Sequence, residues 1–161
     1  MSSTQLAENV QFRSATPADL EEVLRHRRGM FRDMGFTDQD TLNGVAESSR
    51  EFIRRGLQEG WYRGWFAVAG GRVVAGAGLL ITDWVAHPLS PHDPRRAYVL
   101  NVYTDPEFRR RGLAKQLMST IVEACRSEGF RAVWLHASQH GRSIYSSLGF
   151  EPTNEMKLVL Y

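Results

Sequence analysis

The chain has 161 residues, of which 42% are hydrophobic and 24% charged, and this suits one globular domain with its own core. A formal net charge of +2 does not indicate a nucleic-acid-binding protein, and no run of about 18 apolar residues predicts a membrane-spanning helix. A single cysteine, Cys125, excludes an intrachain disulfide; since the N-terminus also lacks a signal-peptide pattern, we expect a cytoplasmic location.

A short strand and a helix are predicted near the N-terminus. Residues 1–9 are expected to form a flexible tail, so that the domain spans residues 10–161. Apolar and polar residues alternate over residues 10–15, which favours a strand. Thr16 and Pro17 then suit the N-cap and the first position of a helix, because proline lacks only an amide that would be unpaired there.

A second helix and a β-hairpin follow. Residues 41–58 place apolar side chains at the i, i+3, i+4 and i+7 spacing of one helical face, and Gly60 ends the pattern. Residues 65–81 contain two apolar runs separated by Gly70 and Gly71, which tolerate the positive φ angles of a two-residue hairpin turn. We therefore expect two antiparallel strands here.

An irregular loop, a central strand and a long helix come next. Three prolines in residues 82–96 favour a loop, whereas residues 97–104 form a nearly continuous strand signal typical of a central strand. Residues 112–128 have an apolar face about half the circumference wide, as in a helix that lies on a sheet. Cys125 lies on that face and is predicted to serve in packing alone.

The C-terminal part is predicted to hold a strand, a short helix and a last pair of strands. Residues 132–138 form the strand, in which His136 is expected to be a core residue, and residues 143–148 form the helix. The final strand pair surrounds residues 156–161. The element order predicts a mixed α/β domain.

Three adjacent arginines stand immediately before the long helix. Acidic residues are preferred at this position because the helix dipole is positive there, yet Arg109, Arg110 and Arg111 precede Gly112. A bound anion would make the cluster favourable, and Gly112 has no side chain to keep an anion from the backbone amides. On these residues alone, a phosphate-binding turn and a solvated basic turn are equally good interpretations. Neither the P-loop pattern nor G-x-G-x-x-G is present.

The same residues resemble a known family. The run RRRGLA at residues 109–114 is similar to the R/Q-x-x-G-x-G/A signature of the GNAT superfamily of N-acetyltransferases, and it follows a strand that ends in VYT. The run SQHGRSIYSSLGFEPTNEM at residues 138–156 resembles the second conserved segment of that family. The resemblance implies a GNAT-like α/β domain with a mixed, mostly antiparallel central sheet flanked by helices. It also implies N-acetyltransferase activity with acetyl-coenzyme A (acetyl-CoA) as the donor.

The resemblance further implies which residues bind the cofactor. Amides around residues 110–114 would hold the pyrophosphate, and the end of the strand at residues 97–104 would pair through its backbone with the pantetheine chain. Ser138 stands where family members often have an asparagine, and its shorter side chain would reach less far. The implied cofactor-binding residues are Val102, Tyr103, Thr104, Arg109, Arg110, Arg111, Gly112, Leu113, Ala114 and Ser138. No metal is expected.

Catalysis is implied to depend on Tyr145, which stands where the family has its general acid. Its hydroxyl would protonate the departing thiolate, and a phenol pKa of about 10 suits that role. The alternative is a tyrosine that only packs against the cofactor. No carboxylate lies in residues 97–104, so the base that deprotonates the amine stays open between Asp83, His87 and a water relay.

The acceptor is predicted to bind between the first two helices and the loop at residues 82–96. The candidate lining residues are Phe31, Met34, Phe36, Trp84 and His87. The expected acceptor is a primary amine of a small molecule or peptide, and a second copy of the chain is a further candidate partner because many family members form homodimers. A catalytically inactive acyl-CoA-binding sensor or interaction module of the same fold is the alternative. Neither nucleic acid nor membrane is an expected partner.

Overall fold

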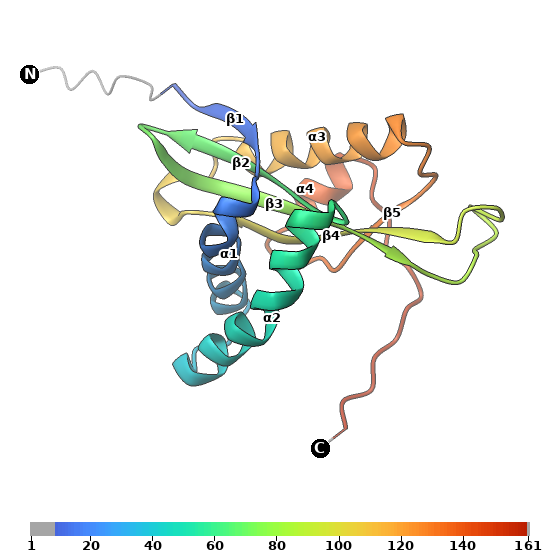
Figure 1. Cartoon of the computed structure of the whole chain (residues 1–161), viewed down its shortest axis with the longest axis horizontal. Coiled ribbons are helices and arrows are strands. Elements are labelled where there is room, and N and C mark those ends of the chain that lie inside the picture. Colours follow the sequence, from blue (N-terminus) through green and yellow to red (C-terminus); the bar gives the residue numbers. More distant parts are fainter. Residues whose placement is uncertain (1–8, 161) are drawn as a thin grey trace, which may run out of the picture.

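Five strands form one sheet in the order β1-β2-β3-β4-β5, with helices on both faces (Figure 1). The computed structural model describes residues 9–160, so most of the predicted tail lies outside the described residues. The strands are β1 (Gln11–Ser14), β2 (Tyr62–Ala69), β3 (Arg72–Asp83), β4 (Arg95–Thr104) and β5 (Val133–Leu135). The helices are α1 (Leu20–Asp33), α2 (Gln39–Glu59), α3 (Leu113–Ser127) and α4 (Arg142–Ser147), with short 3-10 turns at Pro17–Asp19 and Pro106–Phe108.

The pairing of the strands confirms the predicted mixed, mostly antiparallel sheet. Strands β1 to β4 pair antiparallel with their neighbours, and only β4 and β5 are parallel. Gly70 and Gly71 have φ angles of 55° and 77°, so the predicted turn between β2 and β3 is confirmed. No helix among residues 9–160 is both long and apolar enough to cross a membrane.

The loop predicted over residues 82–96 is shorter than expected. Thr82 pairs with Arg96 and Asp83 pairs with Arg95, so both ends of the predicted loop are strand. The irregular part is residues 84–94, which contains all three prolines. Proline cannot donate to a strand ladder, so the prolines mark where the pairing stops and not the full length of the connection. The paired ends and this loop project beyond the sheet as a hairpin (Figure 1).

Two apolar clusters hold the helices on the sheet. On one face, residues of α1 and α2 such as Leu24 and Ile53 pack against Tyr62 and Phe66 of β2. On the other face, α3 packs its apolar stripe against β2, β3 and β4. Cys125 belongs to that stripe with 1% of its surface exposed, and burial raises the pKa of its thiol to about 11. A thiol of that kind is a weak nucleophile at neutral pH, which agrees with the predicted packing role.

Three predictions for the C-terminal part are wrong in whole or in part. Strand β5 has three residues and not seven, and His136 lies beyond its end, exposed and hydrogen-bonded to the hydroxyl of Tyr98. Residues 151–160 form no strand, so the expected final strand pair is absent from the described part of the chain. A strand requires a neighbouring backbone for its ladder, and within residues 9–160 nothing pairs with the outer edge of β5.

Replacing either of two glycines of α2 by alanine should change the free energy of unfolding, in opposite directions for the two positions. At Gly44 a methyl group would meet nothing within 4 Å, so we expect Gly44→Ala to raise the free energy of unfolding by about 0.5–1 kcal/mol through helix propensity. At Gly56 the methyl would lie 2.5 Å from Cβ of Tyr62 and 2.7 Å from the ring of Trp61. Overpacking there should outweigh the same helical gain, so that Gly56→Ala lowers the free energy of unfolding by about 1–2 kcal/mol. Urea denaturation measures both, and equal stabilisation by the two changes would contradict the expectation.

Candidate active site

Strands β4 and β5 separate partway along their length. They are paired from Ala97 with Val133 to Val99 with Leu135, and β5 ends there while β4 continues to Thr104. From Leu100 onward, β4 pairs with β3, and within residues 9–160 no strand pairs with its other edge. Backbone amides and carbonyls at such an edge can pair with an extended ligand that carries amide groups.

A bulge in β4 accompanies the separation. Gly78 pairs with Leu100 and Gly76 pairs with Tyr103, so two residues of β4 oppose one of β3. Asn101 occupies the bulge with a φ of 55°, a left-handed conformation that is uncommon outside glycine. Its side-chain amide is buried and donates to the Tyr62 hydroxyl at 2.9 Å, which holds the bulge in place. Because bulges bend the strand that carries them, this one is the physical reason that β4 turns away from β5.

The turn from β4 into α3 leaves a run of backbone amides without acceptors. The first amide to bond back along the helix is that of Gln116, which donates to the Gly112 carbonyl at 3.1 Å. Within the described chain, no backbone or side-chain acceptor takes a hydrogen bond from the amides of residues 110–115. Such amides, together with the helix dipole, are suited to an anion such as a phosphate group.

The backbone conformation of this turn explains its glycine. Gly112 has a φ of 76° and faces open space, since a Cβ atom added there would meet nothing within 4 Å. Arg110 also has a positive φ, 62°, which is unusual for a residue with a side chain. Two residues with positive φ so close together bend the backbone sharply, and such conformations are common in turns that bind ligands.

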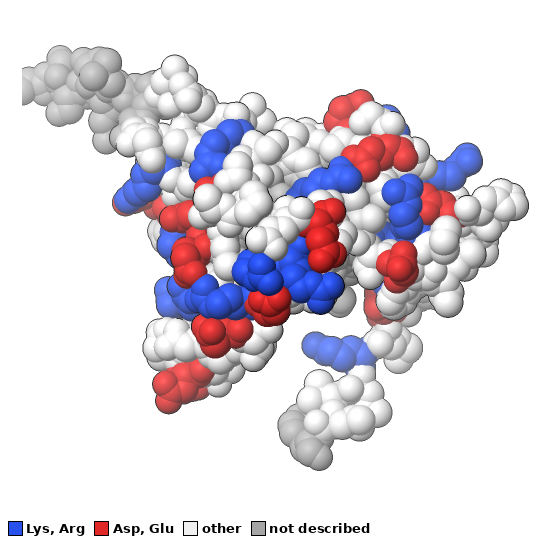
Figure 2. Space-filling view, viewed as in Figure 1, with Lys and Arg blue, Asp and Glu red and all other residues white. Residues whose placement is uncertain are grey.

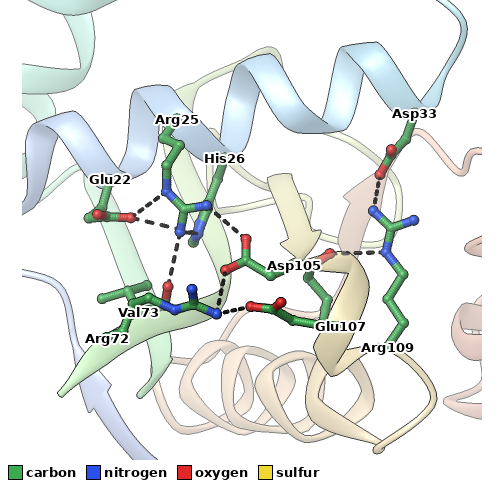
Figure 3. A network of polar contacts seen from close by, with 10 residues as sticks. Glu22, Arg25, His26, Asp33, Arg72, Val73, Asp105, Glu107 and Arg109 are labelled. Carbon is green, nitrogen blue, oxygen red and sulfur yellow. Dashed lines mark hydrogen bonds and ion pairs between the residues drawn. The ribbon is translucent and has the colours of Figure 1, made fainter. Parts of the chain in front are cut away.

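The three arginines before α3 have different hydrogen-bond partners, and Figure 3 shows those of Arg109. The guanidinium of Arg109 donates to a carboxylate oxygen of Asp33 at 2.6 Å and to the carbonyl of Thr104 at 3.0 Å. Arg111 donates to the carbonyl of Glu107 at 3.1 Å. The guanidinium of Arg110 has no polar partner within the described part of the chain. Of the three, Arg110 is therefore the side chain best placed to approach an anion, and Arg109 and Arg111 shape the turn.

A partly buried ion pair anchors the start of the turn to α1. Arg25 donates to a carboxylate oxygen of Asp105 at 2.7 Å, to the Val73 carbonyl at 3.0 Å and to Glu22 at 2.8 Å (Figure 3). The Asp105 amide in turn donates to the Val74 carbonyl at 2.8 Å. This anchor could not be found from the sequence, because Arg25 and Asp105 are 80 positions apart and no sequence pattern pairs them.

His26 beside this network should make the protein less stable in mild acid. Burial, and secondly the charge of Arg25, lower the pKa of His26 to about 3, and its Nε2 lies 3.1 Å from an Arg25 nitrogen. In the unfolded chain the imidazole takes up a proton below about pH 6.5, whereas the folded protein keeps it neutral. The free energy of unfolding should therefore fall by up to about 1.4 kcal/mol per pH unit as the pH drops from about 6.5 to 5.

Urea denaturation at several pH values tests this dependence. The control is His26→Asn, which removes the titrating ring and should flatten the slope over the same interval, whatever its effect on stability at neutral pH. The hydrogen bond from Arg13 is the main reason that the pKa of Asp19 is lowered to about 2. Asp19 therefore changes the free energy of unfolding only at pH values below this interval. A slope unchanged in the variant would mean that another group causes it.

Tyr145 lies on α4 and belongs to the apolar cluster that α3 forms with the sheet. The residue is 9% exposed, its ring lies 6.0 Å from that of Phe150 between centroids, and burial raises the pKa of its hydroxyl. A methyl group at Gly141 would lie 2.7 Å from the Tyr145 ring, so the glycine leaves room for it. The Oγ of Ser138 accepts a hydrogen bond from the Gly141 amide at 3.2 Å and so closes the turn before α4.

The residues expected to line the acceptor pocket fall into two separate groups. Phe31, Met34 and Phe36 lie at the turn between α1 and α2, where the rings of Phe31 and Phe36 pack 5.9 Å apart. Trp84 and His87 lie on the projecting hairpin, at the opposite end of the molecule in Figure 1. The prediction of one pocket lined by all five residues is therefore wrong, because β3 and β4 continue as strands and carry the loop away from the helices.

Comparison with known proteins shows which proteins the chain is similar to. Residues 11–153 match the acetyltransferase (GNAT) domain family. A GCN5-related N-acetyltransferase from Ralstonia eutropha JMP134 shares 36% identity with a TM-score of 0.89, over 94% of this chain and 99% of that one. A predicted acetyltransferase from Clostridium acetobutylicum, solved with acetyl-CoA, shares the fold with a TM-score of 0.85 and 21% identity, over 94% of this chain and 96% of that one.

Curated relatives match over shorter stretches. Human N-acetyltransferase 8 is 29% identical over 98 residues, which is 56% of this chain and 39% of the relative. The chain spans about two fifths to one half of the length of the curated relatives that it matches. These matches therefore concern the domain and not the whole of each relative.

Proposed function

The chain belongs to the GNAT family of acetyltransferases, and we propose that it transfers the acetyl group of acetyl-CoA to a primary amine of a small molecule or peptide. The observation that carries the proposal is the run of unpaired amides at residues 110–115 at the end of the open edge of β4. A diphosphate and an extended chain of amides, joined in one ligand, would fit these two features together.

In this proposal, the turn before α3 binds the pyrophosphate of the cofactor and β4 binds its pantetheine chain. Amides of residues 110–114 hold the pyrophosphate, with the Arg110 guanidinium as an added cation. Val102 offers backbone groups to the pantetheine chain on the edge that β5 leaves open, whereas the amide and carbonyl of Tyr103 face its ladder partner Gly76 in β3. Leu113 contributes its amide alone, because its side chain is buried under the sheet. Thr104 offers its amide, whereas its carbonyl already accepts a hydrogen bond from Arg109.

Tyr145 is the proposed general acid. Acetyl-CoA supplies an acyl group activated as a thioester, and the acceptor nitrogen forms a bond to the acyl carbon as the carbon–sulfur bond breaks. The hydroxyl of Tyr145 gives its proton to the departing sulfur, and the amine loses its surplus proton to solvent. Because burial raises its pKa, the hydroxyl stays protonated at neutral pH and is available as a donor.

No side chain is proposed as the general base. Asp83 pairs in the ladder with Arg95 at the root of the projecting hairpin, and the Nδ1 of His87 accepts a hydrogen bond from the Leu89 amide at 3.1 Å. Both residues therefore belong to the hairpin and not to the open edge of β4. A water relay, or an amine that arrives unprotonated, leaves the chemistry intact, and turnover should then increase with pH as the acceptor amine becomes neutral.

Two measurements test the proposal in sequence. Acetyl-CoA should raise the melting temperature in a concentration-dependent way, whereas the acetyl thioester of pantetheine, which lacks the diphosphate, should raise it much less. Thiol release on a panel of primary amines should then identify acceptors. No stabilisation by acetyl-CoA would refute the site. Stabilisation without thiol release on any amine would favour an inactive acyl-CoA-binding module of the same fold.

A further inference from the structure

Arg27 on α1 is a partly buried cation without an opposite charge beside it. Its Nη1 donates to the side-chain oxygen of Asn101 at 3.0 Å, and its guanidinium lies over the ring of Phe31, 5.0 Å from the centroid. Its Nε is buried without a hydrogen-bond partner, and within residues 9–160 the guanidinium forms no ion pair. Burial lowers the pKa of this guanidinium, because the charged form loses hydration. An anionic partner at this position would therefore be stabilising.

Several other arginines of α1 and α2 are neutralised by carboxylates of the protein itself. Figure 2 shows positive and negative side chains alternating over these two helices. The ion pairs include Arg25 with Asp105, Arg50 with Glu21, and Arg54 with Glu51. Arg27 differs from these arginines, because its hydrogen-bond partner in the described part of the chain is a neutral amide.

Arg27 lies close to the point where β4 and β5 separate. Its partner Asn101 occupies the bulge of β4, immediately after the last residues that β4 pairs with β5. In the proposed function, the pyrophosphate binds at the turn after Thr104 and the pantetheine chain follows β4 back toward the bulge, so that the thioester lies near Asn101. Tyr145, the proposed proton donor to the sulfur, belongs to the apolar cluster on the α3 face of the sheet. The acceptor amine is then left the α1 face, where the Arg27 guanidinium can bind a second group of the same molecule.

A carboxylate is the anionic group that suits this position. Guanidinium groups bind carboxylates through charge-assisted hydrogen bonds, and one carboxylate balances the single charge of Arg27. A phosphate carries about −1.5 to −2 charges at neutral pH, which one guanidinium does not balance. Phe31, which lies under the guanidinium, also packs against Phe36, and Phe36 and Met34 are 53% and 47% exposed. These side chains offer an apolar surface to the carbon skeleton of an acceptor.

We propose that Arg27 selects the acceptor by binding its carboxylate, so that the preferred acceptors are primary amines that also carry a carboxylate, such as amino acids. This inference rests on the proposed acetyltransferase function and names the substrate class of the same site. Arg27 binds and orients the acceptor and takes no part in the proton transfers. Asn101 is a positioning residue, since its side chain accepts from Arg27 and donates to the buried Tyr62 hydroxyl.

Thiol release on matched pairs of amines tests the inference. Leucine, phenylalanine and β-alanine are each compared with their primary amide, which has the same skeleton without the negative charge. The wild-type protein should use the acids with a kcat/KM at least about tenfold higher than the amides. The amine of an amide is less basic and more often neutral, so this chemical difference works against the expected order and cannot produce it.

Substitution of Arg27 should remove the preference. Arg27→Met, which keeps much of the length without the charge, should lower kcat/KM for the acids by roughly tenfold to a hundredfold, mainly through KM. The amides should change by less than about threefold, because they make no charge-assisted bond. Arg27→Lys keeps the charge and should retain part of the preference. The rise in melting temperature with acetyl-CoA should be the same in both variants as in the wild type, which also verifies that they fold.

Binding of the product gives a readout that does not depend on turnover. With coenzyme A present, the acetylated form of the best acid should raise the melting temperature of the wild-type protein more than its amide does, and this difference should vanish in Arg27→Met. The matched control is Arg32→Met, which removes an exposed arginine of the same helix and should leave the preference for acids unchanged.

The outcomes separate this inference from the proposed function. Equal kcat/KM for acids and amides in the wild type would overturn the role of Arg27 and leave the acetyltransferase function standing. A preference for acids that survives in Arg27→Met would have the same meaning. Faster acetylation of O-phosphoethanolamine than of β-alanine would overturn the carboxylate in favour of a phosphate. Binding of acetyl-CoA without thiol release on any amine would overturn both proposals.

Discussion

Replacing Gly112 by glutamate should abolish binding of acetyl-CoA. The residue is the N-cap of α3, has a φ of 76° and lies within the run of unpaired amides. A glutamate there places a carboxylate against the pyrophosphate and offers the free amides an anion from the chain itself, so the ligand meets repulsion and competition together. We expect affinity to fall by at least about a hundredfold, which corresponds to roughly 2.7 kcal/mol or more. Isothermal titration calorimetry with acetyl-CoA measures the loss.

The control for this change is Gly112→Gln. Glutamine has the same size and the same left-handed strain as glutamate, without the charge, so the difference in affinity between the two variants isolates the electrostatic part. A Cβ at this position meets no neighbouring atom within 4 Å, and both variants should therefore fold. Wild-type affinity in the glutamate variant would mean that the diphosphate does not bind at this turn.

Removing the hydroxyl of Tyr145 should lower turnover strongly while leaving the affinity for acetyl-CoA nearly unchanged. Tyr145→Phe keeps the ring that packs against Phe150 and over Gly141, so the surroundings stay intact. The lost proton donor should reduce kcat by about a hundredfold to ten-thousandfold. Steady-state kinetics on the best amine from the panel, with a separate titration of acetyl-CoA, distinguishes the two effects.

The pH profile gives this prediction a second readout. A general acid acts in its protonated form, and burial raises the pKa of Tyr145 above its usual value of about 10. Wild-type turnover should therefore hold through mildly alkaline pH and decline only above that raised pKa, whereas the phenylalanine variant should lack this decline. Tyr98→Phe, which removes a hydroxyl that contacts His136, is the matched control and should leave kcat unchanged. An unaltered rate in Tyr145→Phe would remove the hydroxyl from the mechanism.

Features that depend on neighbouring residues could be predicted from the sequence. The turn at Gly70 and Gly71, the apolar face of α3 and the glycine at the start of that helix each follow from a few adjacent positions. The gap between β4 and β5 could be expected only from the family resemblance, because its cause is the bulge at Asn101, which depends on the distant partner Tyr62. The different roles of the three arginines could not be predicted from the sequence either, because Arg109 donates a hydrogen bond to Asp33, which is 76 positions away.

The remaining errors share one physical cause. An alternating sequence pattern indicates that a segment suits a sheet. It does not indicate which strand the segment will pair with. His136 follows a strand that ends early, and residues 156–160 have the right alternation without a neighbour in the described part of their own chain. Tertiary pairing decides such segments.

The unpaired amides at the start of α3 have a consequence for how this protein can diverge. These groups belong to the main chain, so substitutions at most surrounding positions leave the binding surface as it is. What natural selection must preserve is a backbone path: the two left-handed residues, Arg110 and Gly112, and the helix that follows them. Side chains elsewhere on the domain are then free to drift toward new acceptors while the donor continues to be recognised.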